Sequence, residues 1–268
     1  MKTQNMMSRV ALMGRAFLAV GLLAGAAGFT QPNPALAGAG NADNPKVIPP
    51  QASPNGNTYG EWSALWWQWA LGIPFEQNPL LDESGANAGL NQSGSVWFLA
   101  GNFGGTSDRC VTLPTGKKLF FPVINNFWVT TCQGEPRTKE GIRPLIAPFI
   151  DAATGLAAEV DGVPLQNLAQ YRVESPLFCT PLRLFGVETA EDLEAAGFCP
   201  PGESDPDCSA LPNPDEHFGT YEGFGPGMAD GYWIMLAPLS AGEHTVRFTA
   251  ASGEFSLDVT YHLTVVDE

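Results

Sequence analysis

The carboxyl-terminal segment constrains the fold more than any other feature of the sequence. From Phe255 to Val265 every odd-numbered residue is apolar and every even-numbered residue is polar. This period of two is typical of a strand with one face buried and the other in water. Residues 245–249 show the same alternation, so the two segments predict an antiparallel hairpin at the end of the chain.

The turn between these two strands sets their register. We place a two-residue turn at 252–253, which sets Arg247 directly opposite Asp258 and predicts a cross-strand ion pair. A slip by one residue would oppose apolar to polar side chains along the whole hairpin. The same register puts His244 on the core face and His262 on the outer face. The two imidazoles therefore cannot share a metal ion, and the sequence predicts neither a metal site nor a cofactor.

A tryptophan-rich helix precedes the strands. Thr58 and Glu61 form a capping-box pattern, in which each side chain satisfies the backbone donor of the other residue. The helix that they predict runs through four tryptophans to Leu71 and ends at Gly72.

Short apolar runs follow this helix. Residues 96–99 and 119–124 are bounded by Gly, Asn and Pro and predict buried strands, and residues 156–174 predict two strands joined at 161–162. One helix followed by many short strands is typical of a mainly β fold. We expect a β-sandwich or jelly-roll-like core with one Trp-rich amphipathic helix packed on it.

Two stretches are less regular. Residues 138–153 are partly helical in pattern, although Pro144 and Pro148 weigh against a helix. Residues 175–227 hold three cysteines and many prolines. They predict a long irregular excursion that contains a short helix at 189–196.

The amino terminus has the pattern of a cleaved export signal. A basic segment comes first, residues 16–29 are uncharged and mostly apolar, and Ala-Leu-Ala at 35–37 suits a signal peptidase. The apolar stretch is shorter than the roughly 20 residues of a membrane-spanning helix. We expect residues 1–37 to be the signal peptide, with an amphipathic targeting peptide or a buried helix as the alternatives. Residues 38–57 then predict a flexible leader, and residues 58–268 a single β-rich domain.

The charge of the chain weighs against anionic partners. Without residues 1–37 it has ten basic and 28 acidic residues, a net charge of −18. A surface this acidic repels nucleic acid and anionic membranes. It suits cationic ligands or Ca²⁺, although solubility alone explains it more simply.

An acidic run is the candidate for Ca²⁺ binding. It comprises Glu203, Asp205, Asp207, Asp215 and Glu216. The EF-hand spacing is absent and nearby prolines restrict how the carboxylates converge, so a solvated loop is the simpler interpretation.

Five cysteines lie beyond the signal, and in an oxidising compartment we expect most of them to pair. Cys110 and Cys132 flank one turn and one strand, and we predict a disulfide between them. Among Cys179, Cys199 and Cys208 three pairings are open. We favour Cys199 with Cys208, because the shortest loop closes at the least entropic cost.

The tryptophan helix carries the most distinctive candidate site. At 100° per residue three of its tryptophans share one face, whereas Trp67 and Leu71 project from the other side. A second apolar face indicates either a helix buried on both sides or a platform on which a ligand such as a sugar ring stacks. Packing of Trp67 beneath a loop is the simpler interpretation, and ligand binding by Trp67 and Leu71 is the functional hypothesis.

Catalytic patterns are scarce. The chain has three histidines and no metalloprotease motif, nucleophile elbow or phosphate loop. A carboxylate pair for glycoside chemistry would be drawn from Glu61, beside the tryptophans, and Asp230, before Tyr232. A helix cap and a turn residue explain these two acids more simply.

The chain resembles a group of exported bacterial proteins of no known activity. The resemblance rests on the tryptophan helix at 62–69, the strand at 119–126, Asp-Gly-Tyr-Trp at 230–233 and Gly-Glu-His-Thr at 242–245, and it spans roughly residues 58–266. It implies an extracytoplasmic location and supplies no ligand or catalytic residue.

Together these features favour an exported protein, secreted or periplasmic, that acts as a non-catalytic binding or structural module. Its expected partner is carbohydrate or another exterior protein, without nucleic acid and without a membrane anchor once the signal is removed. The alternative is a secreted hydrolase or lyase acting on polysaccharide. An enzyme should show a cleft with two or more convergent titratable side chains, whereas a module should show an aromatic patch.

Overall fold

A computed structural model describes residues 44, 46–205, 207–208, 217–218 and 222–267. The signal peptide expected at 1–37 lies outside the described residues. The fold is mainly β, as predicted, and consists of two mixed sheets with helices packed on one of them. Sheet A contains, in order, β1 (Val96–Phe98), β3 (Lys118–Val129), β9 (Phe224–Leu236), β7 (Leu177–Thr180) and β8 (His217–Phe218), and β6 (Arg172–Glu174) also pairs with β9. Sheet B contains β2 (Gly105–Pro114), β11 (Phe255–Val266), β10 (Gly242–Ser252), β4 (Ala153–Val160) and β5 (Val163–Pro164).

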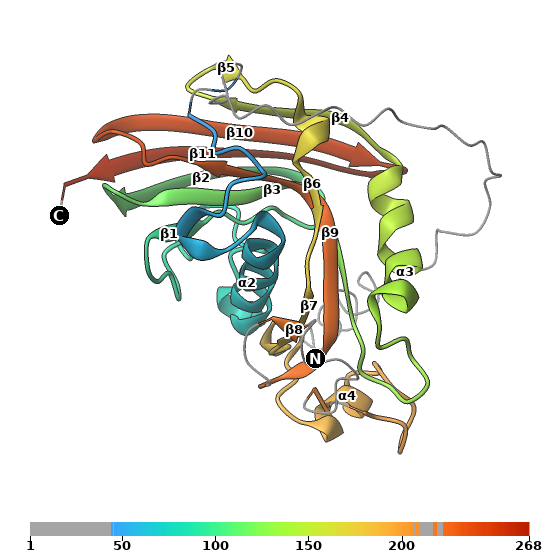
Figure 1. The fold of residues 1–268 in the computed structure, drawn as a ribbon. Coiled ribbons are helices and arrows are strands. Elements are labelled where there is room, and N and C mark those ends of the chain that lie inside the picture. Colours follow the sequence, from blue (N-terminus) through green and yellow to red (C-terminus); the bar gives the residue numbers. More distant parts are fainter. Residues whose placement is uncertain (1–43, 45, 206, 209–216, 219–221, 268) are drawn as a thin grey trace, which may run out of the picture.

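The helices are α2 (Tyr59–Gly72), α3 (Lys139–Asp151) and α4 (Ala190–Ala195), and the 3₁₀ turns are η1 (Pro54–Gly56), η2 (Phe75–Gln77), η3 (Leu168–Tyr171) and η4 (Arg183–Phe185). Sheet A lies between sheet B and α2 (Figure 1). On one side of it Phe121 stacks on Phe248 of sheet B, with ring centroids 5.1 Å apart. On the other side Trp233 packs against Trp66 of α2 at 5.4 Å. This sandwich with a helix on its outer face confirms the predicted fold class.

A β-bulge divides β3 into two halves. The pairing of β3 with β9 shifts between Pro122 and Ile124. Bulges increase the local twist, and Figure 1 shows β9 turning from beneath sheet B to run down beside α3. We call residues 118–122 the packed half of β3 and residues 124–129 the open half. Strand β1 pairs only with residues 118–120, so among the described residues no strand covers that edge of the open half.

Helix α2 begins with the predicted capping box. The backbone N–H of Thr58 donates to Glu61 Oε2 at 2.7 Å, and the Glu61 N–H donates to Thr58 Oγ1 at 3.3 Å. Ten of its 14 residues are buried, so the helix is buried on both sides rather than on one face. Sheet A covers one side, and η4 and the loop before β1 contribute to the other.

The carboxyl-terminal hairpin forms with the predicted faces but in a different register. Its turn lies at Gly253-Glu254, one residue later than predicted, and this shifts the strand pairing by two residues, so Arg247 faces Thr260 directly. The reason is that Gly253 has φ 57° and occupies the first central position of the turn. A type II′ hairpin turn requires glycine at that position. Because the shift is an even number of residues, the apolar set still faces the core. Arg247 and Asp258 do form the ion pair, at 2.7 Å, along a diagonal of the ladder.

The two histidines of this hairpin lie on opposite faces, as predicted. His244 pairs with Leu263 in the ladder, and the next residue, Thr245, pairs with His262. Each imidazole has its own carboxylate neighbour, Asp161 for His244 and Asp108 for His262.

Residues 138–153 are more helical than their prolines suggest. Ile142, Ile146 and Ile150 recur every four residues and are almost fully buried in α3, whereas Pro144 and Pro148 lie on its exposed side. The regular apolar spacing therefore outweighs the backbone hydrogen bonds that the prolines remove.

The expected irregular excursion at 175–227 is partly regular. It supplies β7 to sheet A between β9 and β8. The short helix predicted at 189–196 is present as α4, and Thr189 caps it with Asp192.

The prediction of a flexible leader at 38–57 is wrong for the part of this segment that the structure describes. Asn44 is 1 % exposed, and its amide donates to the Gln166 carbonyl at 2.8 Å. Val47 pairs with Leu236 at the end of β9. The small polar residues of this segment suggested flexibility, but these contacts hold it against the sheets.

Candidate functional site

A mainly apolar cavity lies along the open half of β3. It has a volume of about 130 Å³. Successive residues of β3, Phe127 and Trp128, both line it although their side chains point to opposite faces of the sheet, so the cavity wraps around the uncovered strand edge. The rest of its wall includes Trp67 from α2, Phe149 from α3, Phe185 from η4, Phe103, Phe198, Phe255 and Leu257.

Trp67 forms one wall and has an unpaired hydrogen-bond donor. It is 4 % exposed, and its ring packs on Phe127 with centroids 4.0 Å apart. Its indole N–H has no partner among the described groups. The other three tryptophans of α2 differ in this respect, because their indole N–H groups each donate to a backbone carbonyl at 2.9–3.0 Å.

Two further unpaired donors belong to the same wall. The side-chain amide nitrogen of Asn125 and the indole N–H of Trp128 are buried without a partner in the described structure. A buried donor left unpaired costs about 1–3 kcal/mol. Within the described residues five side chains carry such a donor; three of these residues line the cavity, whereas Trp97 and Trp233 do not. These three nitrogen atoms are themselves buried, so a guest in the cavity would reach them only if the wall moved.

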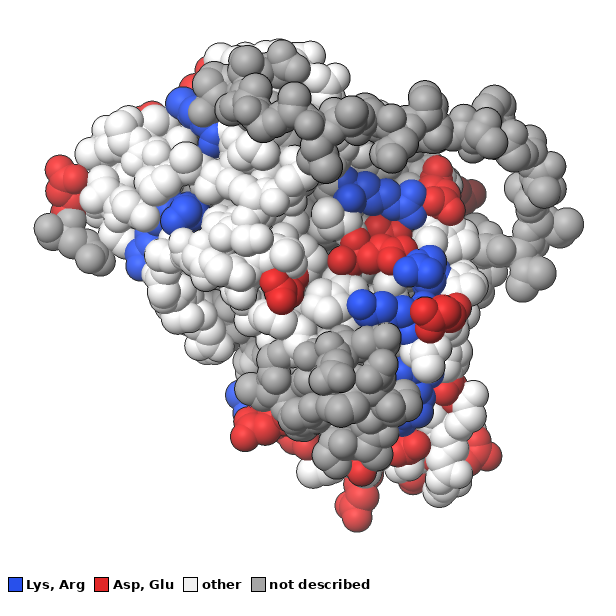
Figure 2. Space-filling model, viewed as in Figure 1, with Lys and Arg blue, Asp and Glu red and all other residues white. Residues whose placement is uncertain are grey.

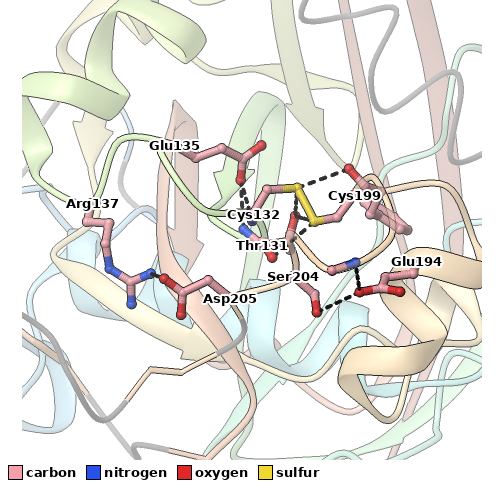
Figure 3. The surroundings of a disulfide bond; sticks show 10 residues. Thr131, Cys132, Glu135, Arg137, Glu194, Cys199, Ser204 and Asp205 are labelled. Carbon is pink, nitrogen blue, oxygen red and sulfur yellow. Dashed lines mark hydrogen bonds and ion pairs between the residues drawn. A yellow bond between two sulfur atoms is a disulfide. The ribbon is translucent and has the colours of Figure 1, made fainter.

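Titratable groups are scarce in the cavity. Glu135 is the only titratable side chain among the described lining residues. Its Oε2 accepts the backbone N–H groups of Thr131 at 2.8 Å and Cys132 at 2.9 Å, which fixes the carboxylate at the end of β3 (Figure 3). A fixed carboxylate without a second titratable group does not form an acid–base pair.

A disulfide anchors the segment that closes this wall. Cys132 bonds to Cys199, directly after Phe198, which lines the cavity (Figure 3). Around it Glu194 accepts from the Ser204 hydroxyl at 3.1 Å, and Arg137 pairs with Asp205 at 3.2 Å. The disulfide thus ties the end of the open half to the segment beyond α4.

Both predicted disulfide pairings are wrong. The second bond joins Cys179 to Cys208, and Cys110 is free and exposed. Cys110 lies on β2 in sheet B, whereas Cys132 follows β3 in sheet A, so the two residues that are near in sequence belong to different sheets. Contacts between distant segments therefore decide the pairing, rather than loop length. Two disulfides indicate an oxidising, extracytoplasmic environment.

The two ligand-binding candidates of α2 have different surroundings. Trp67 is buried against Phe127 and also lines the cavity, so ligand binding by Trp67 stays a hypothesis. Leu71 is 0 % exposed and is not among the lining residues, so it belongs to the core. The sequence could not distinguish Trp67 from Leu71, because both project from the same side of α2. The structure distinguishes them, because the cavity extends toward β3 and not along α2. Phe127, Phe185 and Phe198 carried no recognisable signal, since they come from three separate segments.

The carboxylates considered for catalysis have structural partners. Glu61 caps α2, as described above. Asp230 is fully buried and forms an ion pair with Arg172 at 2.6 Å, and the same guanidinium also binds Asp151. Burial raises the pKa of Asp230, although Arg172 beside it acts in the opposite direction. Figure 2 shows the charged side chains gathered beside α3, where Arg143 and Glu174 form another pair.

The acidic run does not assemble a Ca²⁺ site in the part that is described. Asp205 is paired with Arg137, which also donates to the backbone carbonyl of Asp207. Asp215 and Glu216 lie outside the described residues. No cluster of three or more His, Cys, Asp or Glu side chains suited to a metal occurs in the described residues.

A serine, a histidine and an aspartate meet where β10 begins, at one end of sheet B. His244 Nε2 lies 3.3 Å from Ser240 Oγ, and Nδ1 lies 3.0 Å from Asp161. Nε2 also lies 3.0 Å from the Ser240 carbonyl oxygen, which can only accept a hydrogen bond. The Ser240 hydroxyl thus shares Nε2 with a carbonyl oxygen, and we interpret the group as a structural cap on β10.

Comparison of the chain with protein-family models, with curated proteins and with solved structures returned no significant match in any of the three. Within the described residues no helix combines the length and the apolar character needed to cross a membrane. The functional conclusion therefore rests on the site.

Proposed function

We propose that the chain is an exported, non-catalytic binding module whose site is the cavity along the open half of β3. The observation that carries this proposal is a cavity with aromatic walls and a few polar side chains, placed along the uncovered edge of β3. Apolar walls with a few placed polar groups are the usual composition of ligand pockets.

Export to the cell exterior is supported from two directions. The amino-terminal signal pattern and the resemblance to exported bacterial proteins favour secretion or a periplasmic location. The two disulfides agree with an oxidising compartment. An exterior binding module of this kind would meet carbohydrate, small organic compounds or other exterior proteins.

The composition of the site favours binding over catalysis. A polysaccharide hydrolase would need two carboxyl groups flanking the scissile bond. The described walls contain only Glu135, which already accepts two backbone N–H groups.

The test is a panel of glycans, polysaccharides and small aromatic compounds, examined for both binding and cleavage by the protein as secreted. We expect binding without turnover. The site is checked with Gly101→Leu, because Gly101 lines the cavity and an added Cβ would approach only Pro122, at 4.0 Å. Gly89→Leu, at an exposed position away from the cavity, is the matched control.

The two variants separate the outcomes. Loss of binding in Gly101→Leu but not in Gly89→Leu supports the cavity as the site. Cleavage of any polysaccharide, or binding that ignores both substitutions, contradicts the proposal.

A further inference from the structure

One edge of β3 is paired at both of its ends and free between them. Strand β1 covers residues 118–120 of this edge. Beyond the open half, the backbone N–H of Asp205 donates to the Thr131 carbonyl at 2.8 Å, so residues 203–205 cover the edge there. Between these two parts no described strand pairs with the edge. We call residues 125–129 of this edge the gap.

The hydrogen bond of Thr130 shows which backbone groups face the gap. Its N–H donates to the carbonyl of Pro226 in β9 at 3.0 Å. Along an antiparallel ladder, residues that bond to one neighbour alternate with residues that face the other edge. Asn125, Phe127 and Val129 therefore turn their N–H and C=O groups toward the gap. Of these groups only the Phe127 N–H has a partner in the described structure, the side-chain oxygen of the preceding asparagine at 2.9 Å.

We infer that the gap receives an extended peptide segment of another exterior protein as an added antiparallel strand of sheet A. This inference rests on the proposed function and specifies the class of partner that the same site takes. A strand supplies N–H and C=O groups at the spacing of the free groups of the gap, whereas a sugar or a small ring does not. Residues 203–205 run antiparallel to β3 along this edge, and the added strand would continue in their direction.

The cavity accommodates one side chain of the added strand. A residue directly opposite Phe127 points to the same face of the sheet as Phe127. On that face Phe127 packs against Trp67 in the wall of the cavity. The volume of about 130 Å³ suits one apolar side chain, since an engineered cavity of about 150 Å³ holds benzene. The small aromatic compounds of the panel would occupy the position of this side chain.

A carboxylate lies at one end of the gap. Glu135 Oε2 accepts the N–H of Thr131 at 2.8 Å, and Oε1 has no partner among the described groups. The whole chain has a net charge of −15. This charge favours a guest with a basic residue near Glu135 and disfavours a second copy of the chain. An antiparallel guest begins opposite Val129, so we expect the basic residue there.

Six peptides test the inference by calorimetry with the secreted protein. Their sequence is acetyl-Lys-Thr-X-Thr-Val-amide, and X is Ala, Val, Leu, Phe, Tyr or Trp at the position expected opposite Phe127. Leu or Phe at X should bind at least tenfold more tightly than Ala, because the cavity takes the larger apolar side chain. Replacing Lys by norleucine should weaken binding about threefold. Glu135→Gln should remove this difference, whereas exposed Glu83→Gln should keep it.

Backbone methylation distinguishes an added strand from a peptide that is held only by its side chain. A methyl group on the N–H of X removes a hydrogen bond to β3 and meets the strand edge, so affinity should fall at least tenfold. A methyl group on the N–H of either threonine points away from β3 and should cost less than about threefold. Neither change alters the protein, so the comparison does not depend on how a variant folds.

Val129→Pro locates the peptide on the protein. It removes an N–H that faces the gap and none that bonds to β9, so sheet A keeps its ladder. Peptide affinity should fall at least tenfold, and urea denaturation checks that the variant is folded. Gly101→Leu should also weaken binding of the Leu and Phe peptides, with Gly89→Leu as its control.

The outcomes separate this inference from the proposed function. Equal affinity of the methylated peptides, or binding that Val129→Pro leaves unchanged, would overturn the added strand while leaving a cavity that binds. Binding of no peptide, together with a panel hit that Gly101→Leu abolishes, would also overturn the inference and retain the module. A dimer in sedimentation that Val129→Pro dissociates would replace the peptide by a second copy. Binding of nothing in either set would remove both proposals.

Discussion

The packed and open halves of β3 are parts of one strand, yet their surroundings differ. In the packed half Leu119, Phe120 and Phe121 are fully buried between sheet B, β1 and α2. The open half begins after the bulge, loses β1 as a neighbour and borders a cavity. Both halves are rich in aromatic residues, so hydrophobicity does not distinguish core from site here.

Two adjacent tryptophans of α2 show how the core and the site differ. Trp66 and Trp67 are 0 % and 4 % exposed. Trp66 packs on Trp233 under the packed half, and its N–H donates to the Leu99 carbonyl at 3.0 Å. Trp67 packs on Phe127 of the open half and leaves its N–H unpaired. The neighbouring ring and the adjoining cavity distinguish these two tryptophans, because Trp233 under the packed half also has an unpaired N–H.

The largest expected effect tests how far the open half depends on its disulfide. Replacing Cys132 and Cys199 together by Ala opens a loop of 67 residues. Chain entropy then lowers the free energy of unfolding by about 4 kcal/mol. Urea denaturation measures this loss. Cys110→Ser is the control, since Cys110 is free and exposed and should cost little. Equal losses in the two proteins would contradict the observed pairing.

The next effect breaks or supports the contrast between the two tryptophans. Trp66→Phe leaves a cavity and an unpaired carbonyl on fully buried Leu99, so we expect a loss of about 2–4 kcal/mol in unfolding free energy. Trp67→Phe also removes ring contacts, but it removes an unpaired donor as well, and the loss should stay below about 1 kcal/mol. Denaturation of both variants under one condition measures the difference. Equal costs would show that the open half is ordinary core.

The packed region is the part that the sequence predicts well. In sheet B the period-two alternation specifies which side chains are buried, and Val246, Phe248, Val259 and Tyr261 are all 0 % exposed. Local patterns suffice here, because each residue of a hairpin meets a neighbour that is close in sequence. Only the turn was misplaced, because the φ that Gly253 adopts depends on its position in the turn.

The open half could be predicted only in part. The helix side that carries Trp67 was recognisable, but its neighbours Phe127, Phe185 and Phe198 meet only after the bulge and a disulfide bring three segments together. Unpaired donors have no sequence signature, since the tryptophans of α2 look alike before their partners are known.

A pH-dependent effect belongs to sheet B, which covers the packed half. Burial would raise the pKa of Asp161, but hydrogen bonds from Lys46, the Thr245 N–H and His244 lower it to about 2. A carboxyl whose pKa is depressed in the folded state stabilises the protein above its ordinary value near 3.8, and this contribution is lost as the pH falls toward 2.

We therefore expect Asp161→Asn to cost about 1–2 kcal/mol at pH 6, after allowance for screening of a side chain that is 32 % exposed. The difference from the unsubstituted protein should shrink between pH 4 and pH 2. Unfolding curves across this range measure it, with exposed Glu83→Gln as the control. A constant difference at all pH values would refute the assignment to this carboxylate.

The smallest expected effect concerns the exposed face of sheet B. It measures how much a paired polar contact on the surface contributes to the free energy of unfolding. Arg247 and Asp258 pair diagonally at 2.7 Å, with side chains 46 % and 35 % exposed. Exposed pairs contribute about 0.2–1 kcal/mol and weaken in salt. A double-mutant cycle with Arg247→Ala and Asp258→Ala should return a coupling in this range that falls in 1 M NaCl. Thr249→Ala in place of Asp258→Ala is the register control, because Thr249 lies directly opposite Asp258 and has no charge to couple with Arg247. A coupling above about 2 kcal/mol would equal the cost of leaving a buried donor unpaired. It would show that an exposed ion pair in sheet B contributes as much to stability as a buried polar contact.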